Sequence, residues 1–177
     1  MSPRVLAVLA ALLLVAACTE EKKFDAPSEK KPLSSDEAKS RDAFLAAFPV
    51  FMHPRCMNCH PSGDAPLQGE DSHLHAQNVQ RGPDGRGKFA LKCAACHQDA
   101  NLPGANMPPG NPNWRLPSAD MPLVFQGHTA ASLARQLKDP KKNGGKTLEE
   151  ILHHVTEDGL VKGCWEPGEG RAKPPLA

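Results

Sequence analysis

The sequence predicts a mainly α-helical domain with extensive irregular loops, and three observations support this fold class. Only 55 of the 159 residues after Cys18 are apolar, and the same stretch holds 31 Gly and Pro residues. Amphipathic runs follow capping boxes, and no segment alternates apolar and polar residues as a half-buried strand does. Because ordering a residue costs about 1–2 kcal/mol of backbone entropy, so little apolar material predicts that a staple or a large cofactor completes the core.

Three amphipathic helices are expected. The first covers about residues 35–48 after the capping box Ser34-x-x-Glu37, and the second covers residues 129–138 and stops at Asp139-Pro140. The third opens at the capping box Thr147-x-x-Glu150. The apolar faces at helical spacing are Phe44, Ala47, Phe48 and Phe51; Ala130, Leu133, Ala134 and Leu137; and Leu148, Ile151, Leu152 and Val155.

Between the first two helices the chain is rich in Gly and Pro. Residues 61–87 read as one long loop, residues 88–98 as a short helix, and residues 101–122 as irregular again. A loop of this length inside a compact domain usually has a function or wraps a ligand.

The N-terminus has the features of an export signal. Residues 1–17 combine a basic start with a continuous apolar run that is too short to span a bilayer comfortably. Val15-Ala16-Ala17-Cys18 resembles the bacterial lipoprotein box, so Cys18 is the expected lipidation site; a plain secretory signal with a chance cysteine is the alternative. Residues 18–33 then form a charged flexible tether, and residues 34–177 the folded domain. The expected location is the periplasmic side of a bacterial membrane, with the outer membrane slightly favoured because no Asp follows Cys18.

The charge balance excludes one class of partner. The formal net charge is +1 and there is no block of Lys and Arg. Nucleic-acid binding normally needs a clustered basic surface, so no nucleic-acid partner is expected.

Four cysteines form two copies of one motif. Cys56-Met57-Asn58-Cys59-His60 and Cys93-Ala94-Ala95-Cys96-His97 both match C-x-x-C-H, the attachment signature of c-type haem. Two thiols at this spacing on a helical turn can reach both vinyl groups of one porphyrin, and the histidine can bind the iron as proximal ligand. The sequence therefore predicts two haem c groups, held covalently through Cys56, Cys59, Cys93 and Cys96, with His60 and His97 on the irons.

Other uses of these cysteines explain less. A structural zinc, two local disulfides or a thioredoxin-like redox pair would each account for C-x-x-C pairs. None of them gives a reason for a histidine after both pairs. Cys164 is left over, and it is either buried and inert or paired with another molecule.

The sixth iron ligand separates an electron carrier from a catalyst. His53 lies just upstream of the first motif, from where it could reach a neighbouring haem, and His75 could close over the first haem from the long loop. We expect bis-histidine ligation of at least one haem, with His53 and His75 as the distal ligands. The alternatives are His73, Met107, which precedes two prolines, and Met121.

With these motifs in place the chain resembles the small two-haem periplasmic c-type cytochromes. The segments HPRCMNCHPSGDAPLQG, NVQRGPDGRG, CAACHQ, MPPGNPNWRLP, MPLVFQG, QLKDPKKNGG and WEPGEGR resemble a family of small bacterial dihaem proteins, often labelled isoquinoline 1-oxidoreductase subunits or cytochrome c-like proteins. The resemblance runs over about residues 48–171 and implies short helices packed around two haems.

The function expected from these observations is electron transfer. A membrane-tethered dihaem cytochrome c would shuttle single electrons between periplasmic redox partner proteins, docking transiently on each, and would not be an enzyme itself. The alternatives are a dihaem peroxidase-like enzyme with one open iron, and a cytochrome subunit of a periplasmic molybdenum oxidoreductase.

A pyridine haemochrome assay of the purified lipoprotein tests the cofactor prediction. We expect two covalently held haems per chain, because each C-x-x-C-H motif supplies both thioethers and one iron ligand. A colourless protein would instead support the zinc or disulfide interpretation.

Overall fold

The computed structural model describes residues 32–175, which form short helices and loops with two very short strands. The elements are α2 (Ser35–Met52), α3 (Pro54–Met57), β1 (Leu67–Gln68), β2 (His73–Leu74), the 3₁₀ turn η1 (Cys93–Ala95), α4 (Ala130–Lys138), α5 (Leu148–Glu157) and α6 (Gly159–Trp165). The predicted fold class, mainly α-helical with extensive loops, is confirmed for the described residues. The predicted signal, the lipidation site Cys18 and most of the tether lie outside the described residues.

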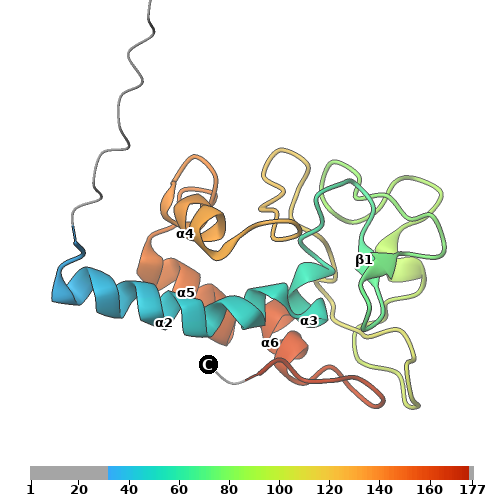
Figure 1. Cartoon of the computed structure of the whole chain (residues 1–177). Coiled ribbons are helices and arrows are strands. Elements are labelled where there is room, and N and C mark those ends of the chain that lie inside the picture. The colour runs from blue at the N-terminus through green and yellow to red at the C-terminus, as the bar shows by residue number, and fades with distance from the viewer. Residues whose placement is uncertain (1–31, 176–177) are drawn as a thin grey trace, which may run out of the picture. The chain divides into compact units, whose positions relative to one another are not determined.

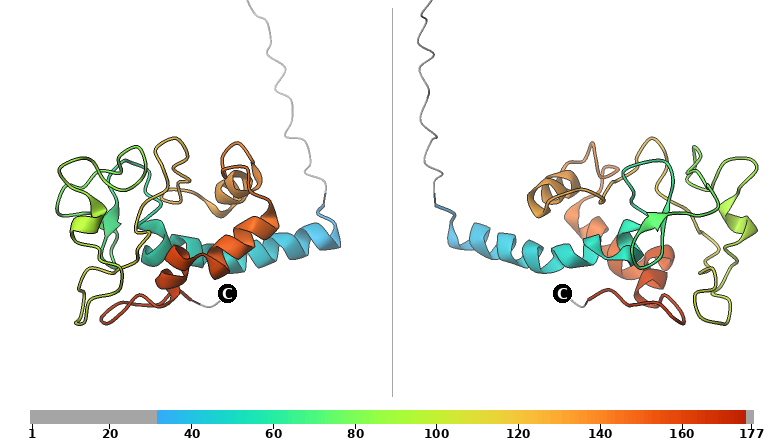
Figure 2. Two further views of the ribbon diagram at one scale, coloured as in Figure 1. Left: turned by 180° about the vertical axis from the view of Figure 1, so that it is seen from behind. Right: turned by 45° about the vertical axis from the view of Figure 1, so that its right-hand side comes forward.

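Within the unit that begins at Ser35, helices and loops occupy different regions (Figures 1 and 2). α4 packs against α2, and α6 packs against α3 and α5. The long connection between α3 and α4 forms the loops around β1 and β2 on the other side of α3. Among residues 32–175 there is no helix with the length and hydrophobicity needed to cross a membrane.

Helix α2 is longer than predicted because it continues through Pro49. An interior proline costs a helix about 3 kcal/mol through its missing N–H and its ring clash. Packing outweighs this cost: Phe51, beyond the proline, stacks on Phe44 at 6.0 Å and meets the edge of the Phe125 ring at 5.4 Å. The aromatic face expected from the sequence is therefore part of the core.

The core is small and centres on α4. Leu133 is fully buried, Leu137 and Phe125 are nearly so, and Phe44, Phe48, Phe51 and Ile151 pack against this cluster. The helix begins as predicted at Thr129, whose hydroxyl accepts from the Ser132 N–H at 3.2 Å while the Ser132 hydroxyl accepts from the Thr129 N–H at 2.9 Å. This reciprocal box satisfies two N–H groups that the helix leaves without partners.

Helices α5 and α6 form a bent pair. The predicted box at Thr147 is confirmed, since Glu150 accepts from the Thr147 N–H at 2.8 Å. Asp158 then ends α5 and caps α6 by accepting from the N–H groups of Leu160 and Val161. No local sequence pattern predicts α6, because the helix is short and contains two glycines. Leu148 and Leu152 are expected from the sequence on the packed face of α5, but each is 63% exposed. Of the aliphatic residues on that face, Ile151 alone packs against the cluster around Leu133.

Two expectations for the connection were wrong in detail. Residues 88–98 are not a helix: Lys92 is extended, and the single turn η1 follows it. Local bonds compete with the helix, since the Lys92 ammonium donates to the Gly87 carbonyl and the Cys93 N–H to the Arg86 carbonyl. The loop 61–87 contains the antiparallel pair β1–β2, in which Leu67 faces Leu74 and Gln68 faces His73. Pairs this short give no periodic signal in the sequence.

Replacing Leu133 by Ala should lower the free energy of unfolding by about 2–5 kcal/mol, because it leaves a cavity at the centre of the small core. Denaturant unfolding of the purified protein measures the effect. Leu148→Ala is the matched control at an exposed leucine and should change the free energy by less than about 0.5 kcal/mol. Equal effects of the two substitutions would contradict this description of the core.

Candidate functional site

The first C-x-x-C-H motif lies on α3 and the turn that follows it. Pro54 occupies the first turn of the helix, and His53 caps it by accepting the Arg55 N–H on Nδ1 at 3.2 Å. The turn continues past the helix, where the Cys59 N–H donates to the Cys56 carbonyl at 3.2 Å and the His60 N–H to the Met57 carbonyl at 3.0 Å. The two thiols and the imidazole are thus fixed on consecutive turns of one short segment.

The His60 ring is held from two sides. Its Nδ1 lies 2.6 Å from the carbonyl oxygen of Leu123, and its ring stacks on Phe125 at 3.9 Å with an interplanar angle of 16°. A carbonyl only accepts, so Nδ1 carries the proton and Nε2 keeps its lone pair. Burial, the largest cause, lowers the pKa of His60 to about 4, so the ring is neutral at physiological pH.

The second motif has the same arrangement. The His97 N–H donates to the Cys93 carbonyl at 2.9 Å, closing the turn at η1. His97 Nδ1 lies 2.7 Å from the Pro109 carbonyl oxygen, and the ring stacks on Trp114 at 4.2 Å with an interplanar angle of 9°. Burial again lowers the pKa of this histidine.

Both motif histidines therefore present a neutral ring whose Nε2 is available to a metal. Histidine ligands in proteins typically donate their other ring N–H to a carbonyl or carboxylate, which fixes the tautomer and the ring orientation. Four residues that no sequence motif indicates provide this setting, namely Leu123, Phe125, Pro109 and Trp114. The partner of His60 lies 63 residues away in sequence, and no local pattern identifies it.

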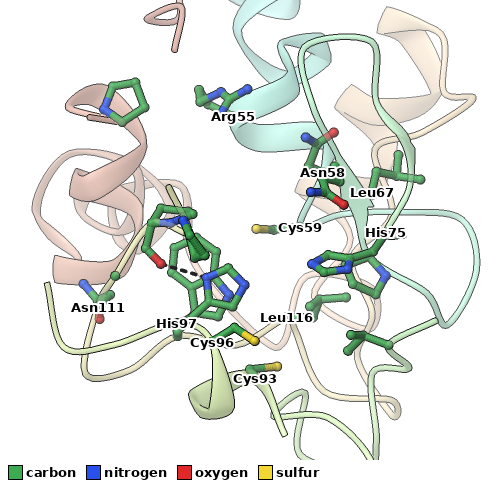
Figure 3. A pocket seen from close by; sticks show the side chains of 18 of the residues that line it. Arg55, Asn58, Cys59, Leu67, His75, Cys93, Cys96, His97, Asn111 and Leu116 are labelled. Atoms are coloured by element: carbon green, nitrogen blue, oxygen red, sulfur yellow. Dashed lines mark hydrogen bonds between the residues drawn. The ribbon is translucent and has the colours of Figure 1, made fainter. Parts of the chain in front are cut away.

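A cavity of about 440 Å³ lies between the two motifs (Figure 3). Three of the four motif cysteines, Cys59, Cys93 and Cys96, line it together with His97. Its volume falls within the range of about 300–1,000 Å³ that is usual for ligand and cofactor sites. The loops thus bring the two motifs, more than 30 residues apart in sequence, to one cavity.

Two of the predicted distal ligands line the same cavity. His75 lies beside His97, with ring centroids 6.4 Å apart and an interplanar angle of 61°. It therefore adjoins the second motif rather than the first, over which the sequence analysis expected it to close. His73 is half-exposed at the cavity edge, and its Nδ1 lies 2.6 Å from Asp71.

The other three distal candidates do not line this cavity. His53 caps α3 through its Nδ1 atom. Met107 is 41% exposed, and its backbone carbonyl accepts a hydrogen bond from Arg171. The Met121 side chain lies near Gly144. In sequence, Met121 is two residues before Leu123, whose carbonyl holds His60.

Burial raises the pKa of four thiols in this region. All five cysteines of the described part of the chain are free, and burial raises the pKa of Cys56 to about 12 and that of Cys164 to about 11. Burial also raises the pKa of Cys59 and Cys93. Redox-active C-x-x-C pairs have lowered thiol pKa values instead, so the geometry gives no support to a thioredoxin-like role. Cys164, on α6, is half-buried and lines the cavity.

The residues around the cavity fit a porphyrin better than a bare metal ion. Residues 32–175 contain no group of three or more His, Cys, Asp or Glu side chains placed to bind a metal together. A haem iron needs only axial ligands from the protein. Side-chain atoms at the cavity also lack protein partners: Arg55 Nε, Asn58 Oδ1 and His75 Nδ1 are buried without a hydrogen bond. Orphaned polar atoms of this kind are expected where a polar cofactor completes a site.

Comparison with known proteins adds no relative. No protein-family model, curated protein or solved structure matches the chain.

The sequence predicts haem on Cys56 and Cys59; on that prediction, replacing Cys59 by Ala should remove one of two thioethers, leave that haem attached through Cys56 alone and lower the fraction of chains that carry it. Mass spectrometry of the intact chain and of its haem-bearing peptides measures this. Cys164→Ala removes a thiol at the same cavity but outside both motifs, and it should leave two haems attached. Loss of a haem in the Cys164 variant would contradict these assignments.

Proposed function

We propose that the protein is a dihaem c-type cytochrome that carries single electrons. One observation supports this most strongly: both C-x-x-C-H motifs present their histidine in the same way, with Nδ1 on a backbone carbonyl and the ring against an aromatic side chain. A structural pair of cysteines needs no such histidine. Two independent copies of the arrangement indicate a role that both motifs share.

Each motif would hold one haem. Cys56 and Cys59 would bind the first through thioethers, Cys93 and Cys96 the second, with His60 and His97 as proximal ligands. When bound, such a group supplies an iron that alternates between Fe(II) and Fe(III). The chain orients the imidazoles through the Leu123 and Pro109 carbonyls, and Phe125 and Trp114 shield them from water.

We propose His75 as the distal ligand of the second haem. A metal–imidazole bond is about 2.0–2.1 Å long and the ring adds about 1.1 Å to its centroid, so two imidazoles on one metal ion have centroids roughly 6–6.5 Å apart. The separation of 6.4 Å between His75 and His97 agrees with this requirement. A site with protein ligands on both sides supports electron transfer rather than catalysis.

The proposed setting follows from the sequence. Residues 1–17 would direct export, lipidated Cys18 would anchor the chain at a bacterial membrane, and residues 18–33 would tether the domain on the periplasmic side. Partners would be periplasmic redox proteins that dock transiently. Small, short-lived interfaces are usual for electron-transfer encounters.

Carbon monoxide separates this proposal from a haem enzyme with an open iron. The carrier proposal requires a protein ligand in the sixth position of both irons, so the reduced wild-type protein should show no rapid shift of its Soret band with CO. His75→Ala should gain CO binding at one haem per chain. His73→Ala, two residues away at the cavity edge, is the control and should behave as the wild type. Rapid CO binding by freshly purified wild-type protein would defeat the carrier interpretation.

A further inference from the structure

The cavity has a cationic end that the proposed function does not use. Figure 3 shows Cys93 and Cys96 at one end of the view, Arg55 at the other, and Cys59 between them. Arg55 comes from α3, and a second arginine that lines the cavity, Arg171, comes from the C-terminal segment.

Arg55 is buried and only partly paired. Its side chain is 11% exposed, its Nη2 lies 2.5 Å from a carboxylate oxygen of Glu70, and its Nε is buried with no hydrogen-bond partner. A buried guanidinium atom without a partner costs free energy, since it has lost its water and gained nothing in return. The N–H of this atom is left without an acceptor.

Arg171 brings a second positive charge to the same end. Its Nη1 donates to the Pro167 carbonyl at 3.2 Å and its Nη2 to the Met107 carbonyl, both neutral acceptors. Burial and then the charge of Arg55 lower the pKa of Arg171, as expected for two guanidinium groups within electrostatic reach of each other. Glu70 is the only carboxylate among the described residues that line the cavity, so two guanidinium groups face one negative charge.

A purely structural role for the Arg55–Glu70 ion pair, which we call a latch, would explain only part of this arrangement. The Arg55–Glu70 pair alone could tie α3 to the loop that follows β1. A latch needs neither the unpartnered Nε nor a second arginine, and like charges placed together are unfavourable without an anion between them. Planar guanidinium groups are well suited to bind carboxylates through two parallel hydrogen bonds.

We infer that Arg55 and Arg171 bind the propionate carboxylates of the haem that Cys93, Cys96 and His97 hold. This inference rests on the proposed function. The vinyl groups that form thioethers and the propionate groups lie at opposite edges of the porphyrin. A cationic end opposite the second pair of cysteines therefore lies where the carboxylates of that haem would be.

The inference assigns the two arginines a role in the reduction potential. A positive charge beside the haem stabilises the reduced state, which carries one more electron, and so it raises the potential. Removing Arg55 should lower the potential of one haem, whereas removing the negative charge of Glu70 should raise it. If the Arg55–Glu70 pair were only a latch, both substitutions would shift the reduction potential in the same direction, because each one breaks the same ion pair.

The test uses the full-length holoprotein and the variants Arg55→Gln, Arg171→Gln and Glu70→Gln, with exposed Arg135→Gln as the control. Pyridine haemochrome first gives the haem count, and a spectroelectrochemical titration then gives both midpoint potentials. For Arg55→Gln and Arg171→Gln we expect the reduction equilibrium of one haem to shift by about tenfold toward the oxidised form, which is about 59 mV for a one-electron couple. Glu70→Gln should shift it the opposite way, and Arg135→Gln should leave it unchanged.

The outcomes separate the two proposals. Wild-type protein without covalent haem would overturn the proposed function itself. Two haems with unaltered potentials in both arginine variants would overturn the propionate assignment alone, as would shifts of the same sign in Arg55→Gln and Glu70→Gln. If Arg55→Gln does not fold, Arg171→Gln decides, because within residues 32–175 the Arg171 guanidinium donates to two backbone carbonyls, those of Pro167 and Met107.

Discussion

His60 lies between the carbonyl oxygen of Leu123 and the ring of Phe125, and this contact joins the first motif to the helical core. Phe125 is part of the core cluster around Leu133, and its ring also stacks on His60. The same segment is fixed at its backbone, since the N–H groups of residues 125 and 126 both donate to the His60 carbonyl. The position of the imidazole therefore depends on core packing, and the small core cannot change without moving it.

The loops between α3 and α4 keep the two motifs at one cavity although they contain almost no regular structure. Close backbone contacts take the place of secondary structure. At Gly85, with φ of +76°, a Cβ atom would lie 2.0 Å from the Leu116 carbonyl oxygen, so a side chain cannot be accommodated. Buried Arg81 adds a second tie, donating from Nη1 to the Pro117 carbonyl and from Nη2 to the Gly63 carbonyl. Glycine and a buried cation thus provide the rigidity that strands or helices would supply elsewhere.

Charge is distributed unevenly even though the chain is almost neutral. The motif histidines are neutral because burial disfavours their charged form, while Arg55, Arg171 and the carboxylate of Glu70 line the cavity. The neutral imidazoles of His60 and His97 would act on a bound haem by coordinating its iron. Arg55 and Arg171 would act on its carboxylates and so on its reduction potential.

Short-range patterns in the sequence determined the fold class, the capped starts of α4 and α5, the core role of Phe44 and Phe51, and the two C-x-x-C-H motifs. These features depend on residues within a few turns of one another, where capping, periodicity and spacing act directly. Tertiary structure alone decided that α2 continues through Pro49, that residues 88–98 form one turn rather than a helix, and that His75 lies beside His97. It also decided which carbonyls and rings hold His60 and His97, and that Arg55 and Arg171 share a cavity. Each of these depends on contacts between distant segments, whose energies outweigh local preferences and leave no pattern in the sequence.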